Sequence, residues 1–139
     1  MPDWLYQPLT SDIIAAYYTV FHTIKPREAY SEENFCEALR IELEQRGHTV
    51  RAQVTVTRTY QGRRIGRPRV DLLVDDKVAL EIKKTRLLKD AHAAQLRAYL
   101  VDGDWAVGLL LNFGGAQPEL RRLENRESSA HRVSASAGE

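Results

Sequence analysis

Three charged residues, Asp71, Glu81 and Lys83, have the types and spacing that could perform hydrolytic chemistry. They lie in two short apolar segments, residues 69–74 and 78–83. In the second segment Glu81 and Lys83 alternate with apolar residues, so an acid and an amine would project from one face of a strand. The pattern therefore predicts a carboxylate and an amine side by side on an otherwise apolar hairpin.

The register of this hairpin decides whether Asp71 joins Glu81. A two-residue loop would pair Val74 with Lys77 and point the two carboxylates to opposite faces. A three-residue loop pairs Val74 with Val78 and places Asp71 opposite Glu81. We predict the three-residue loop because it also puts the apolar residues of both strands on one face. These apolar residues are Val70, Leu72, Val74, Val78, Leu80 and Ile82.

Two facing carboxylates raise each other's pKa unless a cation lies between them. A hard divalent ion with oxygen ligands and retained water resolves that repulsion, and Mg²⁺ fits this description. Lys83 cannot bind a metal while it is protonated, but it can orient or deprotonate a water, or offset the charge of a phosphorane-like transition state. The alternative interpretation is a surface salt bridge on an exposed sheet face.

A third acid, Glu32, follows Ser31 at the start of a predicted helix over residues 31–46. With an advance of about 100° per residue, Glu32 falls about 20° from Leu39, inside the apolar stripe of this helix. An acid in that stripe needs a partner, which a shared metal would supply. Alternatively, Glu32 is solvated and only favours the helix dipole. Periodicity alone leaves both interpretations open.

A predicted helix over residues 89–101 carries His92, Gln95, Leu96 and Tyr99 on one face. Leu and Tyr at this spacing are typical of a core, whereas His and Gln on the same face need hydrogen-bond partners. Gln95 could hold a phosphate or a metal-bound water. The alternative is a partly buried polar pair with satisfied hydrogen bonds.

These residues require a scaffold, and the rest of the sequence predicts an α/β fold in the order α-α-β-β-β-α-β. The predicted helices are 11–24, 31–46 and 89–101, and the predicted strands are 50–57, 69–74, 78–83 and 105–113, with 119–123 as a short edge strand. The first helix is expected to begin at Thr10 or Ser11, and Gly47 is expected to end the second. A continuous apolar run over 105–113 favours a strand buried on both faces.

The 139 residues suit one domain, which we place at residues 1–123. From Glu124 onward Ser, Ala and charged residues dominate, which predicts a disordered tail over residues 124–139. A single cysteine, Cys36, excludes a disulfide framework and a Cys-ligated iron–sulfur cluster. The sequence has neither a secretory signal pattern nor an apolar run of the ~18 residues that span a bilayer, so we expect a cytoplasmic protein.

The overall balance of 20 Lys and Arg against 19 Asp and Glu hides an uneven distribution. Residues 58–69 contain five arginines and no acid, and Lys84 and Arg86 follow the predicted hairpin. The helix over 31–46, by contrast, carries five glutamates. A basic segment beside the predicted site is suited to phosphate contact. The alternative is a solvated loop that arginine keeps soluble.

The spacing of Asp71, Glu81 and Lys83 resembles the signature of the PD-(D/E)XK nuclease superfamily. Over roughly residues 10–123 the chain resembles the small bacterial GxxExxY family within that superfamily. Gln95-x3-Tyr99 also resembles the Q-x3-Y element of the RecB-like exonuclease branch.

The motif that names the GxxExxY family is partly altered in this chain. Ala29, Glu32 and Phe35 stand at the positions of its Gly, Glu and Tyr. Only the glutamate is therefore kept, and it is the acid that the helical periodicity places inward.

The resemblance implies a restriction-endonuclease-like core and a nuclease that uses Mg²⁺ or Mn²⁺, without an iron–sulfur cluster, to hydrolyse DNA. Asp71, Glu81 and the carbonyl of Ile82 would hold the metal, and Glu32 would bind it directly or through water. Lys83 would position the attacking water. Gln95 and Tyr99 would orient the site or the nucleic-acid backbone. The residues expected to contact nucleic acid are Arg63, Arg64, Arg67, Lys84 and Arg86.

Two further hypotheses use the same fold. In the first, the chain is a non-catalytic nucleic-acid-binding module in which the arginine segment does the binding. In the second, it is an assembly module in which the apolar first helix forms a homodimer. The residues expected at that interface are Tyr17, Tyr18, Val20 and Phe21.

Overall fold

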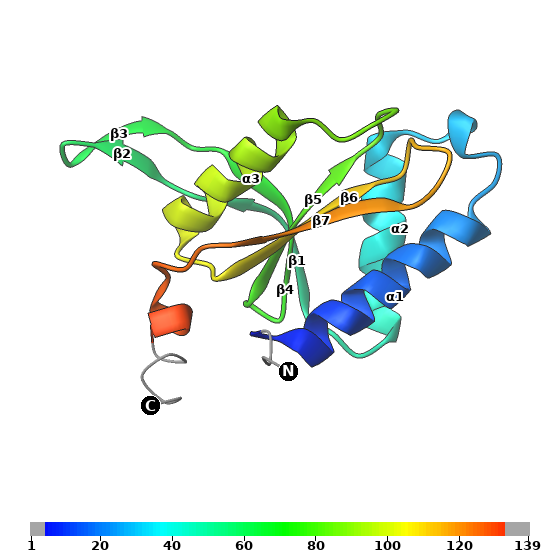
Figure 1. The fold of residues 1–139 in the computed structure, drawn as a ribbon, viewed down its shortest axis with the longest axis horizontal. Coiled ribbons are helices and arrows are strands. Elements are labelled where there is room, and N and C mark those ends of the chain that lie inside the picture. Colours follow the sequence, from blue (N-terminus) through cyan, green and yellow to red (C-terminus); the bar gives the residue numbers. More distant parts are fainter. Residues whose placement is uncertain (1–4, 133–139) are drawn as a thin grey trace.

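The computed structural model describes residues 5–132, in which helices cover both faces of a five-stranded sheet (Figure 1). Helices α1 (Gln7–Thr23) and α2 (Glu32–Gln45) pack on one face, and a short 3₁₀ turn, η1 (Arg27–Ala29), separates them. Helix α3 (Asp90–Gly103) packs on the other face. The predicted α/β class, a small mixed sheet flanked by helices, is confirmed.

The strands of the main sheet stand in the order β1-β4-β5-β6-β7. All neighbours are antiparallel except β5 and β6, which are parallel and are connected through α3. The bounds are β1 (Val50–Thr55), β4 (Arg69–Val74), β5 (Val78–Lys83), β6 (Val107–Asn112) and β7 (Glu119–Glu124). Every residue of β6 is buried, which confirms the interpretation of its apolar run.

Two strands that the sequence interpretation left out form a separate hairpin between β1 and β4. Strand β2 (Arg58–Tyr60) pairs antiparallel with β3 (Arg63–Gly66) around a turn at Gln61 and Gly62. We call residues 58–66 the β2–β3 arm. The arm extends away from the main sheet, past one end of α3 (Figure 1). The arginine-rich segment is therefore a projecting ribbon and not an irregular loop.

The ends of the helices agree with the sequence in one case and differ in another. Helix α2 begins after Ser31, whose hydroxyl accepts a hydrogen bond from Asn34 N at 3.1 Å, and Gly47 with φ 93° follows its end. Helix α1 begins at Gln7, earlier than predicted. The prediction of a start at Thr10 or Ser11 was wrong because Pro8 is well placed in a first helical turn, while Thr10 is buried.

The predicted disordered tail differs from the structure over residues 124–132. Glu124 is the last residue of β7, and Asn125 N donates to Ala106 O at 2.9 Å. Ser128 is fully buried. The polar composition misled the prediction because these contacts are made with segments distant in sequence. Residues 133–139 lie outside the described residues.

Candidate active site

The hairpin of β4 and β5 has the register that the apolar pattern predicts. Val74 pairs with Val78 and Leu72 with Leu80. Asp75 and Asp76 both have positive φ, and Lys77 N donates to Val74 O at 2.9 Å to close the turn. The three-residue loop is confirmed.

The β4–β5 ladder ends one step before Asp71 and Glu81, and the two carboxylates continue the hydrogen bonding in its place. Asp71 N donates to Glu81 Oε1 at 3.1 Å. Ile82 N donates to Asp71 Oδ2 at 2.8 Å. Each carboxylate therefore accepts from the backbone of the opposite strand, and both lie between the two strands where they separate.

Strand β4 also changes the direction of its side chains at Asp71. Leu72 and Val74 pack against α1 and α2, but Val70 packs with Leu73 on the α3 side. The prediction that Val70 shares a face with Leu72 was wrong because strict alternation fails at this point.

Gln53 of β1 lies opposite Asp71 and explains the irregularity. Ala52 pairs with Leu72 and Val54 with Val70, but the ladder skips Gln53, whose φ is 55°. Burial raises the pKa of Asp71, and a hydrogen bond from the Gln53 side chain partly opposes that shift because it favours the ionised carboxylate. The sequence does not predict this role of Gln53. A polar residue in an alternating strand gives no indication that its backbone is left-handed.

Burial makes ionisation of the two acids costly. It raises the pKa of Glu81 to about 8, and the negative charge of Asp71 acts in the same direction. Burial also raises the pKa of Asp71, and the charge of Glu32 adds to the effect. The positive charge of Lys83 opposes both shifts. A buried acid, Glu81, beside a half-buried one, Asp71, disfavours joint ionisation, and a cation would stabilise this pair.

The donor set fits a hard divalent cation. Carboxylate oxygens from Asp71 and Glu81 are ligands that Mg²⁺ prefers. Within residues 5–132, no group of three or more His, Cys, Asp or Glu side chains is placed to hold a metal ion. Two carboxylates would therefore need water, a carbonyl oxygen or a substrate phosphate to complete the coordination, which is how Mg²⁺ is often bound.

Glu32 lies beside this pair without completing a three-carboxylate group. Its Oε2 accepts a hydrogen bond from Lys84 N at 3.1 Å, just beyond the end of β5. Glu32 is exposed in the first turn of α2, yet its charge reaches Asp71 and Glu81. The acid therefore sits at the rim of the site.

Lys84 follows Lys83 but has a different environment. Its ammonium group donates to the carbonyls of Glu28 and Tyr30, in the segment before α2. These bonds hold that segment against the end of β5. The expected contact of Lys84 with nucleic acid stays a prediction.

Helix α3 presents Tyr99 toward the carboxylates from the other face of the sheet. Tyr99 is 6% exposed, and its pKa is raised by burial and by the negative charge of Glu81. The Arg58 guanidinium lies 5.9 Å from the centre of its ring. Gln95, one turn earlier, is exposed to solvent, where it is open to substrate.

His92, which shares this face of α3, lies near Lys83. Its Nδ1 accepts a hydrogen bond from Lys89 N at 3.0 Å. Burial and the charge of Lys83 lower the pKa of His92. The neutral ring therefore caps its own helix, which gives this polar residue the partner that the sequence required.

Cys36 lies on the α2 side of the same site. Burial raises the pKa of its thiol to about 12, and the charges of Asp71 and Glu81 add to that shift. The thiol is therefore protonated at neutral pH and acts as a packed apolar group. The sequence places Cys36 in the core stripe of α2 but gives no sign that it adjoins the acids.

Two of the expected phosphate contacts, Arg63 and Arg64, lie on the β2–β3 arm, and Arg67 directly follows it. Arg63, Arg64 and Arg67 are all exposed, and within residues 5–132 none of them forms an ion pair. Arg86, in the loop after β5, is also exposed. These four guanidinium groups are available to an anionic partner.

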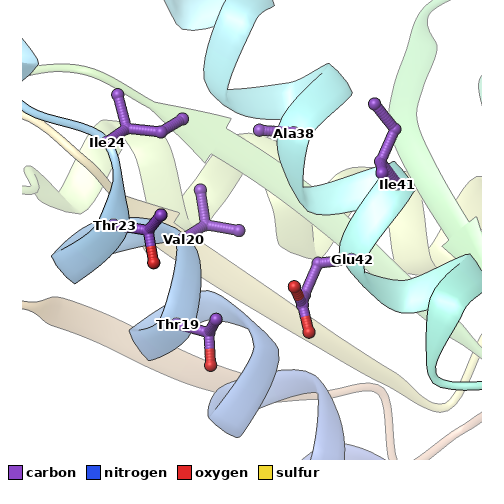
Figure 2. Close-up of a pocket in the computed structure, with 7 residues that line it drawn as sticks. All are labelled: Thr19, Val20, Thr23, Ile24, Ala38, Ile41 and Glu42. Atoms are coloured by element: carbon purple, nitrogen blue, oxygen red, sulfur yellow. The ribbon is translucent and has the colours of Figure 1, made fainter.

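Three of the four residues expected at a dimer interface on the first helix are buried within the chain, and the homodimer stays a prediction. Tyr17, Val20 and Phe21 are buried in the core, while Tyr18 is 41% exposed. A shallow apolar groove does lie between α1 and α2 (Figure 2). It is lined by Thr19, Val20, Thr23, Ile24, Ala38, Ile41 and Glu42.

Comparison with known proteins identifies the family. The model of the PD-(D/E)XK nuclease superfamily matches residues 7–123, so the chain belongs to that superfamily. The solved structure of SSO0001 has a TM-score of 0.56 and 20% sequence identity, and the match covers 73% of this chain and 54% of that chain. That likeness shows the fold alone, and this chain spans about half the length of SSO0001. No curated protein matches the chain.

The comparisons agree with the expected superfamily, while the narrower assignment to the GxxExxY family and the RecB-like branch stays a prediction. Within residues 5–132, no helix is long and apolar enough to cross a membrane.

Proposed function

We propose that the chain is a nuclease that hydrolyses DNA phosphodiester bonds with the help of Mg²⁺ or Mn²⁺. One observation carries the proposal: Asp71 and Glu81 meet between two separating strands, with Lys83 two residues beyond Glu81. The fold and superfamily support it, and we place the chain in the GxxExxY family and the RecB-like branch on the residues named above.

In this mechanism Asp71 and Glu81 would hold the metal, the Ile82 carbonyl would add a ligand, and Glu32 would bind it directly or through water. A divalent ion held there would supply Lewis-acid chemistry for phosphodiester hydrolysis. Lys83 orients the attacking water and offsets the charge that develops on the pentacovalent phosphorus. The charge of Lys83 acts on both Asp71 and Glu81, which supports a role beside them.

The remaining residues bind and orient the substrate. Tyr99 and Gln95 orient the site or the nucleic-acid backbone from α3. The exposed residues Arg63, Arg64, Arg67 and Arg86 contact phosphates, and Lys84 is a further expected contact.

One observation favours a second candidate, a non-catalytic nucleic-acid-binding module. Glu32 does not join Asp71 and Glu81 in a three-carboxylate group within the described residues, so the acids could be structural. This candidate predicts salt-sensitive binding that survives Glu81→Gln and needs no metal. A homodimer built on α1 is compatible with either function, and light scattering would test it.

The decisive experiment incubates the protein with duplex DNA, single-stranded DNA and RNA in the presence of Mg²⁺ or Mn²⁺. We expect cleavage that EDTA, Lys83→Ala and Asp71→Asn each abolish. Intact substrates under all metal conditions would overturn the nuclease proposal. A structure soaked in Mn²⁺ should place an ion about 2.0–2.6 Å from oxygens of Asp71 and Glu81.

A further inference from the structure

A purely structural role does not account for the β2–β3 arm. It is a two-stranded ribbon outside the main sheet, and such ribbons are only marginally stable alone in water. Tyr60 and Ile65 are 63% and 64% exposed, although apolar side chains of that size normally pack. The arm therefore displays surface that the rest of the described chain does not cover.

The charges of the arm are arranged on both of its faces. Tyr60 pairs with Arg63, and Thr59 pairs with Arg64, so the two arginines project from opposite faces of the ribbon. The pairing shifts between Arg58 and Thr59. A ribbon lying flat on a surface would present only one of these guanidinium groups to it. Arginines on both faces match a partner with negative charge on two walls.

The base of the arm is tied to the element that faces the acids. Arg58 Nε donates to Asp102 Oδ2 of α3 at 2.8 Å, and the same guanidinium lies 5.9 Å from the Tyr99 ring. Val56 N donates to Pro68 O at 2.9 Å and closes the base. Gly66, the last residue of the arm, precedes Asp71 by five residues, a reach of at most about 18 Å.

We propose that the β2–β3 arm enters the major groove of duplex DNA and so sets duplex DNA as the preferred substrate. The proposal rests on, and deepens, the proposed nuclease function. Arg63 and Arg64 would contact the phosphate backbones on the two sides of the groove. Tyr60 and Ile65 would meet base edges such as the thymine methyl group.

The dimensions of the arm agree with that groove. Two strands about 4.8 Å apart, with their side chains, fit a groove about 12 Å wide but not the minor groove of about 6 Å. A strand of four residues extends about 13 Å, enough to reach the base of a groove about 8.5 Å deep. The major groove of duplex RNA is too narrow for side chains to read. The same arm of a second copy fits poorly against it, because residues 57–70 hold five arginines and no acid.

The test measures binding in EDTA by fluorescence anisotropy, so that cleavage does not intervene. The probes are a short DNA duplex, one of its single strands and the RNA duplex of the same sequence. We expect wild type to prefer the DNA duplex. The double variant R63Q/R64Q should bind it about tenfold more weakly, with a log–log salt slope shallower by about 2. Tyr60→Ser and Ile65→Ser should each reduce the preference for duplex over single strand.

Two control variants lie away from the arm. Arg51→Gln removes an exposed arginine that pairs with Asp76, and Ile41→Ser removes a 44% exposed isoleucine on α2. Both should bind the DNA duplex as wild type does. If the arm variants bind like these controls, or if single strands or RNA bind as tightly as the DNA duplex, the groove proposal is overturned.

The same variants and probes, assayed for both binding and cleavage, distinguish failure of this inference from failure of the nuclease proposal. Cleavage and duplex binding that persist unchanged in the arm variants would overturn the role of the arm and leave the nuclease standing. Loss of duplex binding in the arm variants, with no cleavage by wild type in Mg²⁺ or Mn²⁺, would support the arm and overturn the nuclease.

Discussion

Acidic side chains lie at both ends of the β4–β5 hairpin: at the closed end, where the turn joins the strands, and at the open end, where the strands separate. The environments of the acids differ between the two ends. At the closed end, His48 bridges two acids: its Nδ1 lies 2.8 Å from Asp75 Oδ2 and its Nε2 lies 2.5 Å from Asp12 Oδ2. At the open end, Asp71 and Glu81 accept hydrogen bonds from backbone N–H groups. No Lys, Arg or His within residues 5–132 forms an ion pair with either of these two acids.

The pKa values follow this difference. The hydrogen bond from His48 holds the pKa of Asp12 below its usual range. At Asp75 burial acts upward, but hydrogen bonds from His48 and Thr49 N outweigh it and lower the pKa. At the open end burial prevails and raises the pKa of both acids. The acids at the closed end are neutralised by the chain itself and are structural. The acids at the open end are at least half-buried and have no paired cation in the described part of the chain, so they are suited to bind an added one.

The largest expected effect is a difference in DNA cleavage rate between variants of the two lysines, Lys83 at the open end and Lys77 at the closed end. Lys83→Ala should reduce metal-dependent DNA cleavage about 10²–10⁴-fold, because it removes the group that orients or deprotonates the attacking water. Lys77→Ala, in the turn at the closed end, should cleave like wild type. Initial rates on a labelled duplex measure both. Equal losses in the two variants would contradict the functional asymmetry of the hairpin.

Metal binding should stabilise the protein through the open end alone. At about 100 times its Kd, Mg²⁺ or Mn²⁺ should raise the free energy of unfolding by about 2.7 kcal/mol relative to EDTA. Asp71→Asn should lose this gain, whereas Asp75→Asn should keep it despite a lower baseline stability. Thermal unfolding with and without metal measures the difference. The same gain in Asp71→Asn and wild type would place the ion elsewhere.

In the absence of metal, Glu81 should weaken the fold as the pH rises. Its pKa is about 8 in the folded protein and near 4.5 when unfolded. Between these values the folded state holds a proton that the unfolded state has released, so the free energy of unfolding falls with rising pH. Glu81→Gln should therefore be more stable than wild type by at least about 1 kcal/mol above pH 8.

That advantage of Glu81→Gln should disappear near pH 4, where both states of wild type are protonated. Urea unfolding in EDTA across this range measures it. Glu33→Gln, an exposed glutamate on α2, is the matched control and should follow wild type. A Glu81→Gln variant less stable than wild type at high pH would show that the folded state accommodates the charge.

The smallest expected effect is the pH dependence of stability that His48 causes at the closed end. Burial opposes protonation of His48, but its hydrogen bonds to Asp12 and Asp75 prevail and raise its pKa above 6.5. Its stabilisation is present below 6.5 and is lost as the pH rises through the folded value. Since these side chains are partly exposed, the loss should be no more than about 1 kcal/mol.

This effect should be measured in the Glu81→Gln background, so that the titration of Glu81 does not overlap that of His48. His48→Gln should remove the pH dependence above 6.5, while His22→Gln, an exposed histidine on α1, should leave it. Toward acid, the stabilisation from Asp12 and Asp75 should be lost as the pH falls through their lowered pKa values. A flat profile for the His22→Gln protein would contradict the bridge.

Much of the site was predictable because it depends on local patterns. Alternating apolar residues in β4 and β5 determine the hairpin register, and that register brings Asp71 and Glu81 together. Ser31 and Gly47 determine the ends of α2 in the same local way. These features need only neighbouring residues and the geometry of strands and helices.

Other parts of the site depend on contacts between distant segments. Gln53 meets Asp71 only because β1 pairs with β4, and its left-handed backbone is stable only in that context. The arm pairs β2 with β3 through short strands of mostly polar residues, which carry little apolar periodicity. The buried Ser128 lies in a segment whose composition alone indicated disorder.

The sequence by itself determined that two acids and a lysine lie on one apolar hairpin, and that arginines gather in the segment before it. Only the tertiary structure decided how those groups behave. Glu81 has a raised pKa because the sheet and its helices exclude water from it, whereas Asp75 has a lowered one because the fold brings His48 to it. The physical reason is that desolvation and charge pairing depend on distance in space and not on distance along the chain.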